Sequence, residues 1–153
     1  IILGIADIPA LDERYVGYSK VSYKIKNGKK TKLKVRNTEK IKDSILNTTS
    51  PYVFANKKDQ KIFEKLAKEV KTVRLGGDCY SYCLLADGHI DLILESGLKP
   101  WDIRALEPII VNAGGIIKTW EGNKIFDGGR IIAATNHKLF KKAKNKMNKK
   151  KPS

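Results

Sequence analysis

The chain has 153 residues, of which 41% are hydrophobic, and a formal net charge of +15. This length and apolar content suit a single domain, residues 1–153, with a hydrophobic core of its own. The apolar run at residues 1–6 is too short to span a bilayer and has no basic segment before it, so neither a transmembrane helix nor a signal peptide is indicated. A cytoplasmic location without membrane attachment is the default expectation.

The positive charge is concentrated in two segments. Residues 17–42 carry ten Lys or Arg against Glu39 alone, and residues 137–153 carry eight Lys and no acid. These two segments have net charges of +9 and +8, which leaves the rest of the chain at −2. A strongly basic protein often binds nucleic acid or an anionic membrane. Here the excess lies in an expected hairpin and in a tail, residues 141–153, that we expect to fray, which disfavours nucleic-acid binding as the main function.

The first third of the chain predicts β-structure. Residues 1–8 have the apolar character of a buried strand, which Pro9 ends. Polar and apolar residues alternate over 15–26, Asn27-Gly28 is a strong hairpin signal, and residues 31–35 continue the ribbon. Its lysines are expected to form a solvated face that protects a sheet edge, with phosphate binding as the alternative.

The next segment predicts a strand, a turn and a helix. Residues 44–51 form a short strand that runs into Thr48, Thr49 and Ser50, whose hydroxyls can cap the next helix or meet a ligand. Asn56 then opens an amphipathic helix over residues 56–70. Its function is packing, because its apolar residues recur at helical spacing; they are Ile62, Phe63, Leu66, Ala67 and Val70.

Two strand ends in the second half carry polar groups. A strand over residues 72–75 delivers Gly76-Gly77-Asp78, and a continuous apolar strand over 90–95 ends at Glu95. Ligand sites in α/β folds gather where strands lead into helices, and paired glycines let a substrate approach the backbone. A tight turn with Asp as the helix cap is the alternative explanation of the first motif.

Cys79 and Cys83 lie four residues apart on the expected helix over 79–86. They share a face but cannot readily reach disulfide geometry there, and no histidine at ligand spacing completes a zinc site. We therefore expect two buried free thiols, which fit a reducing compartment.

Another helix is expected after Pro100, with Asp102 in its first turn. Pro100 disfavours helix at the residue before it, and an apolar stripe at helical spacing follows. A carboxylate in a first turn meets free backbone N–H groups and the positive end of the helix dipole, which keep it ionised. Asp102 is thus a candidate ligand for a hard cation. We expect a bend at Pro108, and Gly114-Gly115 as the end of this helix.

Three motifs of this half carry a resemblance. They are Gly76-Gly77-Asp78-Cys79-Tyr80, the Glu-x-Gly-x-x-x-Trp-Asp pattern of residues 95–102, and Ala113-Gly114-Gly115. Their order and spacing resemble the C-terminal half of the inositol monophosphatase superfamily, in particular its histidinol-phosphate phosphatase branch, over residues 1–140. The implied fold is α/β, a layered sandwich of the sugar-phosphatase type with a mixed sheet flanked by helices. The family's D-P-x-D-G-T motif, and the glutamate before it, have no counterpart in residues 1–153.

The resemblance implies a Mg²⁺-dependent hydrolase of phosphomonoesters. It makes Asp102 the metal ligand and catalytic carboxylate, and it makes Glu95 a contact to a polar group of the substrate. Gly76 and Gly77 would present backbone, while Asp78 and Arg74 would face the part of the substrate that is not phosphate. An acid at Asp78 favours a cationic substrate such as histidinol phosphate, an intermediate of histidine biosynthesis, over an inositol phosphate.

The resemblance also implies an incomplete site. One carboxylate holds Mg²⁺ poorly, because this ion gives up its water reluctantly and needs several oxygen ligands. Arg104 stands where the family usually has a small residue, which puts full activity in doubt. We expect weak Mg²⁺ binding and inefficient hydrolysis from this chain alone, with a homodimer partner or a missing N-terminal half completing the site.

Three hypotheses remain open. The chain is part of a phosphatase; or it is a non-catalytic remnant whose basic ribbon and tail bind nucleic acid or another anion; or it is a degraded product of poor solubility. The first hypothesis predicts a reading frame for D-P-x-D-G-T upstream in the gene. The second predicts salt-dependent anion binding. The third predicts aggregation through an exposed first strand.

Overall fold

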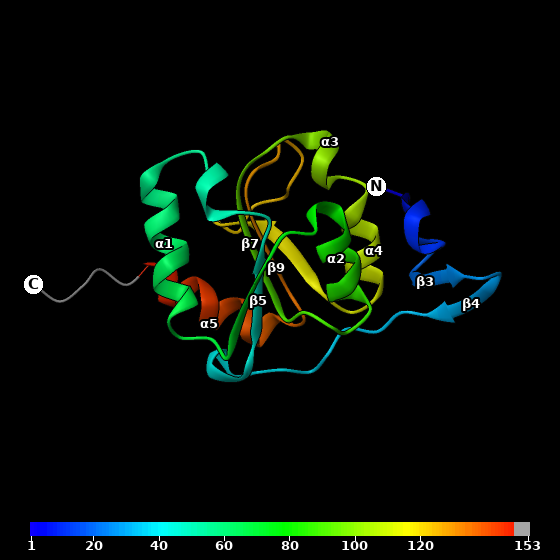
Figure 1. Ribbon diagram of the computed structural model, residues 1–153, viewed down its shortest axis with the longest axis horizontal. Coiled ribbons are helices and arrows are strands. Elements are labelled where there is room, and N and C mark those ends of the chain that lie inside the picture. The colour runs from blue at the N-terminus through cyan, green and yellow to red at the C-terminus, as the bar shows by residue number, and fades with distance from the viewer. Residues whose placement is uncertain (149–153) are drawn as a thin grey trace, which may run out of the picture.

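The computed structural model describes residues 1–148. It has four layers (Figure 1). A four-stranded sheet, which we call the N-terminal sheet, packs on helices α2 and α4. These helices cover one face of a five-stranded sheet, the central sheet, whose other face is covered by α1 and α5. The α/β sandwich predicted from the sequence, with a mixed sheet between helices, is confirmed.

The N-terminal sheet is antiparallel, with the strand order β1-β2-β3-β4. The turn that joins its last two strands has positive φ at Asn27 (48°) and Gly28 (70°), so the hairpin predicted there is confirmed. The short 3-10 helix η1 (Pro9–Leu11) joins the first two strands. The strands are β1 (Leu3–Ile8), β2 (Glu13–Tyr18), β3 (Val21–Lys26) and β4 (Lys29–Lys32).

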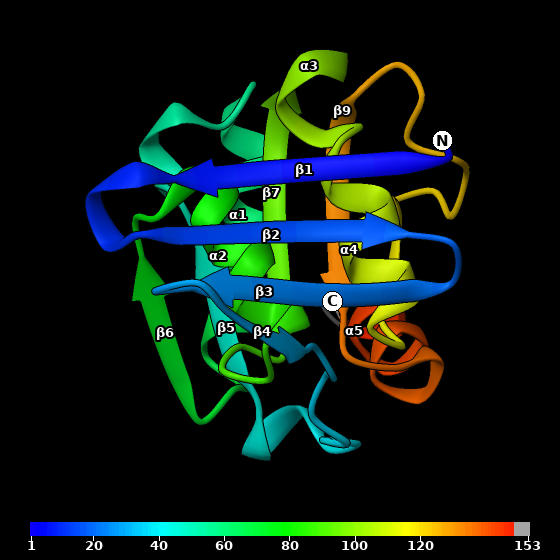
Figure 2. The ribbon, with the colours of Figure 1, turned by 90° about the vertical axis from the view of Figure 1, so that its right-hand side faces the viewer.

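One face of this sheet is open. The strand register places Leu3 opposite Tyr18 and Tyr18 opposite Val21, with Ile5 on the same face, and these four side chains are 39–52% exposed. Figure 2 shows this face towards the viewer with none of the described elements over it. The prediction of a buried first strand is therefore wrong for the outer face of β1. Successive residues of a strand point to opposite faces, and only alternate residues of β1, such as Gly4 and Ala6, point inward.

The inner face of the N-terminal sheet lies very close to α4. A Cβ atom added to Gly4 would overlap the carbonyl oxygen of Ala105, and one added to Gly17 would overlap the backbone of Pro108 and Ile109. Glycine is thus required at both positions by space. The hydroxyl of Ser22 adds a 2.7 Å hydrogen bond to the carbonyl oxygen of Ile109.

The central sheet is mixed, with the strand order β6-β5-β7-β9-β8. Strand β5 runs parallel to β6 and β7, whereas β9 is antiparallel to β7 and β8. The strands are β5 (Ile45–Thr48), β6 (Thr72–Leu75), β7 (Leu92–Leu98), β8 (Ile116–Thr119) and β9 (Gly129–Ala134). Ile93 packs in the core towards α2 and α4, and its neighbours Leu92 and Leu94 pack in the core on the opposite face, which explains the continuous apolar run in β7.

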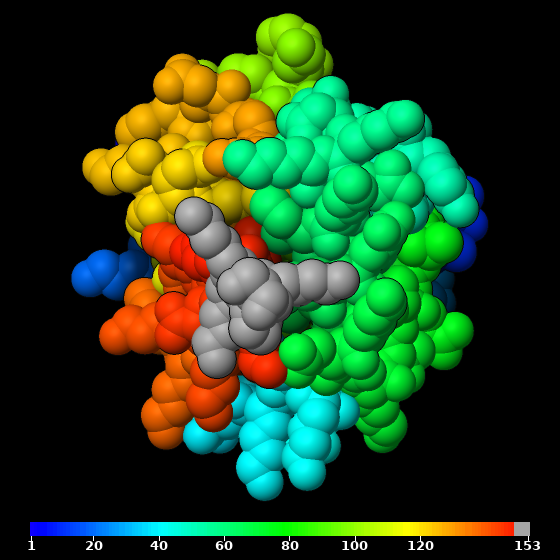
Figure 3. All heavy atoms as spheres, turned by 90° about the vertical axis from the view of Figure 1, so that its left-hand side faces the viewer, coloured from blue at the N-terminus to red at the C-terminus, as the bar shows by residue number. Residues whose placement is uncertain are grey.

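Helices α1 (Lys57–Ala67) and α5 (His137–Asn148) lie side by side on the outer face of the central sheet (Figure 3). The side chain of Asn56 caps α1 by accepting a 2.9 Å hydrogen bond from the Asp59 N–H, as its position in the sequence predicted. Residues 141–148, part of the predicted frayed tail, belong to α5, with Ala143 and Met147 buried. The remainder of that tail, residues 149–153, lies outside the described part of the chain.

The remaining helices are α2 (Asp78–Ala86), α3 (Pro100–Ile103) and α4 (Leu106–Asn112). Two further 3-10 helices, η2 (Ile41–Asp43) and η3 (Pro51–Val53), flank β5. The single bent helix predicted after Asp102 is in fact two helices. They separate at Arg104 and Ala105. Pro108 has no backbone N–H, so the carbonyl of Arg104, four residues earlier, does not receive the usual helical hydrogen bond. Gly114, at φ 99°, follows the end of α4 as predicted. None of the helices in residues 1–148 has the length and apolar character needed to cross a membrane.

Candidate active site

A pocket of about 490 Å³ opens at the edge of the central sheet where the parallel strands β5 and β7 end. Its lining comes from the segment after β5, the beginning of α2, the end of β7, and α3, which lies beyond the end of β7 in Figure 2. Parallel strands bring their carboxyl ends to the same edge, so distant segments converge here. Seven of the lining residues are acids or hydroxyl-bearing residues: Thr49, Ser50, Asp78, Tyr82, Glu95, Ser96 and Asp102.

Asp102 lies at the exposed rim of the pocket. One of its carboxylate oxygens, Oδ2, accepts a 2.8 Å hydrogen bond from the backbone N–H of Lys99 and so caps α3. The prediction that Asp102 stands in the first turn of a helix is confirmed. Its other oxygen and its exposure leave it able to meet a ligand in the pocket.

Asp78 begins α2, also lines the pocket and is exposed. It follows Gly76 and Gly77, and all three residues have positive φ, at 86°, 104° and 43° in chain order. This conformation is disfavoured for a residue with a side chain, although aspartate tolerates it better than most. The turn aims the chain from β6 into α2, and Gly77 rather than Asp78 occupies the N-cap position.

Glu95 forms the floor of the pocket and is only 5% exposed. Its Oε1 accepts a 2.9 Å hydrogen bond from the Thr49 N–H, and its Oε2 accepts a 2.7 Å bond from the Tyr82 hydroxyl. Burial, followed by the charge and hydrogen bond of Glu95, raises the pKa of Tyr82 well above its usual value, so this hydroxyl stays a donor. Each carboxylate oxygen keeps a second lone pair, which is what Glu95 can offer to a ligand.

The charged residues that line the pocket are acidic. The pocket is lined by three acids, and none of the lining residues in the described part of the chain is Lys, Arg or His. Cys79 also lines it, and burial together with Asp78 raises the pKa of that thiol, which keeps it protonated. Cys79 is exposed and Cys83 is buried, so the prediction of two buried thiols is wrong for Cys79, the first of the pair.

The described residues do not form a complete metal site. Within residues 1–148, no group of three or more His, Cys, Asp or Glu side chains could hold a metal ion. Asp102, with a free oxygen at an exposed helix start, has the chemistry of one ligand to a hard cation. The pocket therefore fits a cation only in part, with further oxygen ligands required.

The structure gathers half of the residues predicted for the site. Asp78, Glu95 and Asp102 line one pocket, whereas Arg74, Gly76 and Gly77 are not among its lining residues. Arg74 is exposed on the edge strand β6. Gly76 ties strands together, since its N–H bonds the carbonyl oxygens of Thr48 (3.1 Å) and Thr49 (2.9 Å).

Sequence reasoning did not find Tyr82, Ser96 or the residues behind them. For Ser50 the sequence left capping and ligand contact as alternatives. Its hydroxyl caps η3 by accepting a hydrogen bond from the Tyr52 N–H (3.3 Å), and Ser50 also lines the pocket. A signal for Asp59 was present: this acid takes the buried position of α1 one turn before Phe63. A buried acid on an apolar stripe requires partners, which the structure supplies from β7 and β9.

The layered α/β sandwich, with its acidic pocket at the ends of parallel strands, defines a protein with the sugar-phosphatase type of fold. The chain belongs to the inositol monophosphatase family, whose profile matches residues 1–150. This agrees with the family that the motifs around Asp78, Glu95 and Asp102 had indicated.

Several relatives are similar over most of the chain. It is 41% identical over 141 residues to the bifunctional phosphatase IMPL2, chloroplastic, of Arabidopsis thaliana, covering 88% of this chain and 38% of the relative. It is 28% identical over 148 residues to a histidinol-phosphatase of Mycobacterium tuberculosis, covering 95% and 56%. The solved structure of an inositol monophosphatase from Zymomonas mobilis superposes with a TM-score of 0.89 at 36% identity, covering 97% of this chain and 58% of that one. The chain thus spans about half the length of the curated relatives it matches.

Proposed function

We propose that this chain is the substrate-binding part of a metal-dependent phosphomonoester hydrolase of the histidinol-phosphatase type. The observation that carries the proposal is the convergence of Asp78, Glu95 and Asp102, from three separate segments, on one pocket. Members of the inositol monophosphatase family are in general metal-dependent, and an acidic pocket without a basic lining residue agrees with that chemistry.

Electrostatics supports the need for a cation. A phosphomonoester is an anion at neutral pH and would be repelled by three carboxylates in a partly buried pocket. Magnesium bound there would activate a water molecule and neutralise the phosphoryl and leaving oxygens. The role of this chain is to hold such a cation at the free Oδ1 of Asp102 and to orient the organic part of the substrate.

The substrate class follows from the other two acids. Asp78, on the exposed rim, favours a substrate with a positive charge, such as the amine or imidazolium of histidinol phosphate. The remaining lone pairs of Glu95 accept hydrogen bonds from an amine or hydroxyl at the pocket floor. Relatives named histidinol-phosphatase support this choice, and a solved inositol monophosphatase of 36% identity keeps an inositol phosphate as the alternative.

The described residues supply too few oxygen ligands for tight metal binding, so we propose that full activity needs further polypeptide. The alternative of a nucleic-acid-binding ribbon has less support. Lys24 and Lys26 of the ribbon form ion pairs with Asp87 (2.5 Å) and Glu13 (2.8 Å). They act within the protein rather than towards an external polyanion.

Calorimetric titration of the purified chain with Mg²⁺, with and without inorganic phosphate, tests the proposal. We expect weak binding that phosphate strengthens and that Asp102→Asn abolishes. The control is Asp43→Asn, which removes an exposed acid of η2 outside the pocket. Equal loss in both variants, or none in Asp102→Asn, would contradict the proposed ligand. Efficient release of phosphate from histidinol phosphate by the chain alone would contradict the need for further polypeptide.

A further inference from the structure

One side of the pocket is formed by residues 49–55, which we call the pocket wall. Two consecutive residues of β7 hold its two ends. The Thr49 N–H donates to Glu95 Oε1 (2.9 Å), and the Ala55 N–H donates to Ser96 Oγ (3.4 Å). The pocket wall is therefore hydrogen-bonded at both ends to β7, the strand that forms the floor of the pocket.

The hydrogen bond from the Ala55 N–H to Ser96 depends on a residue outside the pocket. A serine hydroxyl rotates freely, so it accepts from Ala55 reliably only if its own proton is directed elsewhere. That proton goes to Oδ2 of Asp59, a side chain in the first turn of α1 that is 1% exposed. The Asp59 N–H is in turn fixed by the Asn56 cap at 2.9 Å.

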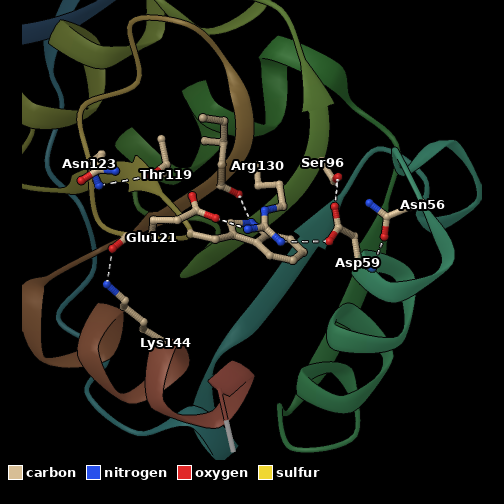
Figure 4. Close-up of polar contacts among 10 residues, drawn as sticks. Asn56, Asp59, Ser96, Thr119, Glu121, Asn123, Arg130 and Lys144 are labelled. Atoms are coloured by element: carbon tan, nitrogen blue, oxygen red, sulfur yellow. Dashed lines mark hydrogen bonds and ion pairs between the residues drawn. The ribbon is translucent and has the colours of Figure 1, made fainter.

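Asp59 is a buried carboxylate, and its counter-ion is Arg130 on β9 (Figure 4). Nη1 of Arg130 lies 3.3 Å from Asp59 Oδ1, and its other terminal nitrogen, Nη2, donates to Glu121. The guanidinium also lies over the ring of Trp120, with 5.3 Å between its central carbon and the ring centroid.

Glu121 is itself held from the outer layer. Nζ of Lys144, on α5, donates a 2.6 Å hydrogen bond to the Glu121 backbone carbonyl oxygen (Figure 4). A chain of contacts thus runs from α5 through β9 and α1 to Ser96 at the pocket. Neither Asp59 nor Arg130 lines the pocket.

We propose that Asp59 and Arg130 are positioning residues for the pocket, which fix the 49–55 wall through the hydroxyl of Ser96. The positioning of the pocket wall does not depend on the proposed function, whereas the effect of these two residues on substrate binding rests on the proposed function. Removing Arg130 leaves Asp59 buried without a counter-charge, which its surroundings relieve by letting water in. Ser96 then loses a fixed acceptor, and the wall detaches at Ala55.

Amide hydrogen exchange measured by mass spectrometry tests the inference. In Arg130→Gln we expect exchange over residues 49–55 to accelerate about tenfold, while the N-terminal sheet and α5 exchange as in the wild type. The double variant Asp59→Asn/Arg130→Gln removes both charges but keeps a carbonyl oxygen for Ser96, so it should restore slow exchange in the wall. Lys138→Gln, which breaks an exposed ion pair with Glu39, is the matched control.

Unchanged exchange of the wall in Arg130→Gln would overturn the inference, and so would a uniform acceleration of the whole chain. If the double variant does not restore slow exchange over residues 49–55, the inference is also overturned. The uncompensated charge of Asp59 would then not be the cause of the faster exchange in Arg130→Gln. The assay needs no turnover, so its failure is distinct from failure of the phosphatase proposal. In the Mg²⁺ and phosphate titration, Arg130→Gln should weaken binding about tenfold and Lys138→Gln should not.

Discussion

The two sides of the pocket use the same functional group in opposite ways. On the rim, Asp78 and Asp102 lie in the first turns of helices and are exposed. On the floor and behind it, Glu95 and Asp59 are 5% and 1% exposed, and both oxygens of each carboxylate have protein partners. The rim acids can bind a ligand with little effect on the stability of the fold. The buried acids instead hold protein groups in place through hydrogen bonds. Mutations on the two sides should therefore separate stability from binding.

The largest effect is expected at the floor. Glu95→Ala leaves the Thr49 N–H and the Tyr82 hydroxyl buried without an acceptor, and we expect a loss of about 3 kcal/mol in the free energy of unfolding. Urea denaturation followed by circular dichroism measures it. Glu95→Gln keeps one acceptor and should lose less. A loss below about 1 kcal/mol in Glu95→Ala would show that Glu95, like the rim acids, contributes little to the stability of the fold.

The same rule is tested away from the pocket at Glu13, in the N-terminal sheet. This side chain is 5% exposed and accepts hydrogen bonds from the Tyr15 hydroxyl (2.7 Å), Lys26 (2.8 Å) and the Tyr80 hydroxyl (3.1 Å). Burial alone would raise the pKa of Glu13, but the hydrogen bonds from Lys26, Tyr15 and Tyr80 outweigh it and lower the pKa from 4.5 to about 2.

A lowered carboxyl pKa stabilises the fold above the unfolded-state value and stops doing so as the pH falls through the folded-state value. A fall in pKa from 4.5 to about 2 corresponds to about 3 kcal/mol. Solvent around the half-exposed Lys26 partner reduces this contribution to about 2 kcal/mol at neutral pH, which is lost progressively between pH 4.5 and about 2. Unfolding of the wild type and Glu13→Gln over this pH range measures the difference, which should shrink with acid. A difference that is independent of pH would show that Glu13 acts by packing alone.

The smallest effect on stability is expected at the rim. Asp102→Asn keeps an oxygen to cap α3, so we expect a loss of about 0.5 kcal/mol from the removed charge at the helix start. Thermal unfolding measures this loss, which should accompany the lost Mg²⁺ response. Arg104→Ala, at the exposed residue that ends α3, should change stability by less than about 0.5 kcal/mol. A loss of several kcal/mol in Asp102→Asn would place that acid among the structural ones.

The sequence allowed the rim and floor acids to be predicted because each follows a local signal. Asp102 follows a helix-starting proline, and Glu95 follows an apolar run of β7. The prediction that the strand ends at Glu95 is wrong, because β7 continues to Leu98. The support behind them could not be predicted in this way. Ser96 and Asp59 lie 37 residues apart, and Arg130 lies 71 residues from Asp59, so only the folded arrangement pairs them. The first strand was misjudged because apolar composition does not say which face is covered.

The positions of the two tryptophans give this protein a built-in optical probe. Trp101 lines the pocket and is 79% exposed, while Trp120 is 5% exposed beneath Arg130. Acrylamide should quench the fluorescence of the first and spare the second, so occupancy at the rim and loosening of the interior can be followed separately in one unlabelled sample.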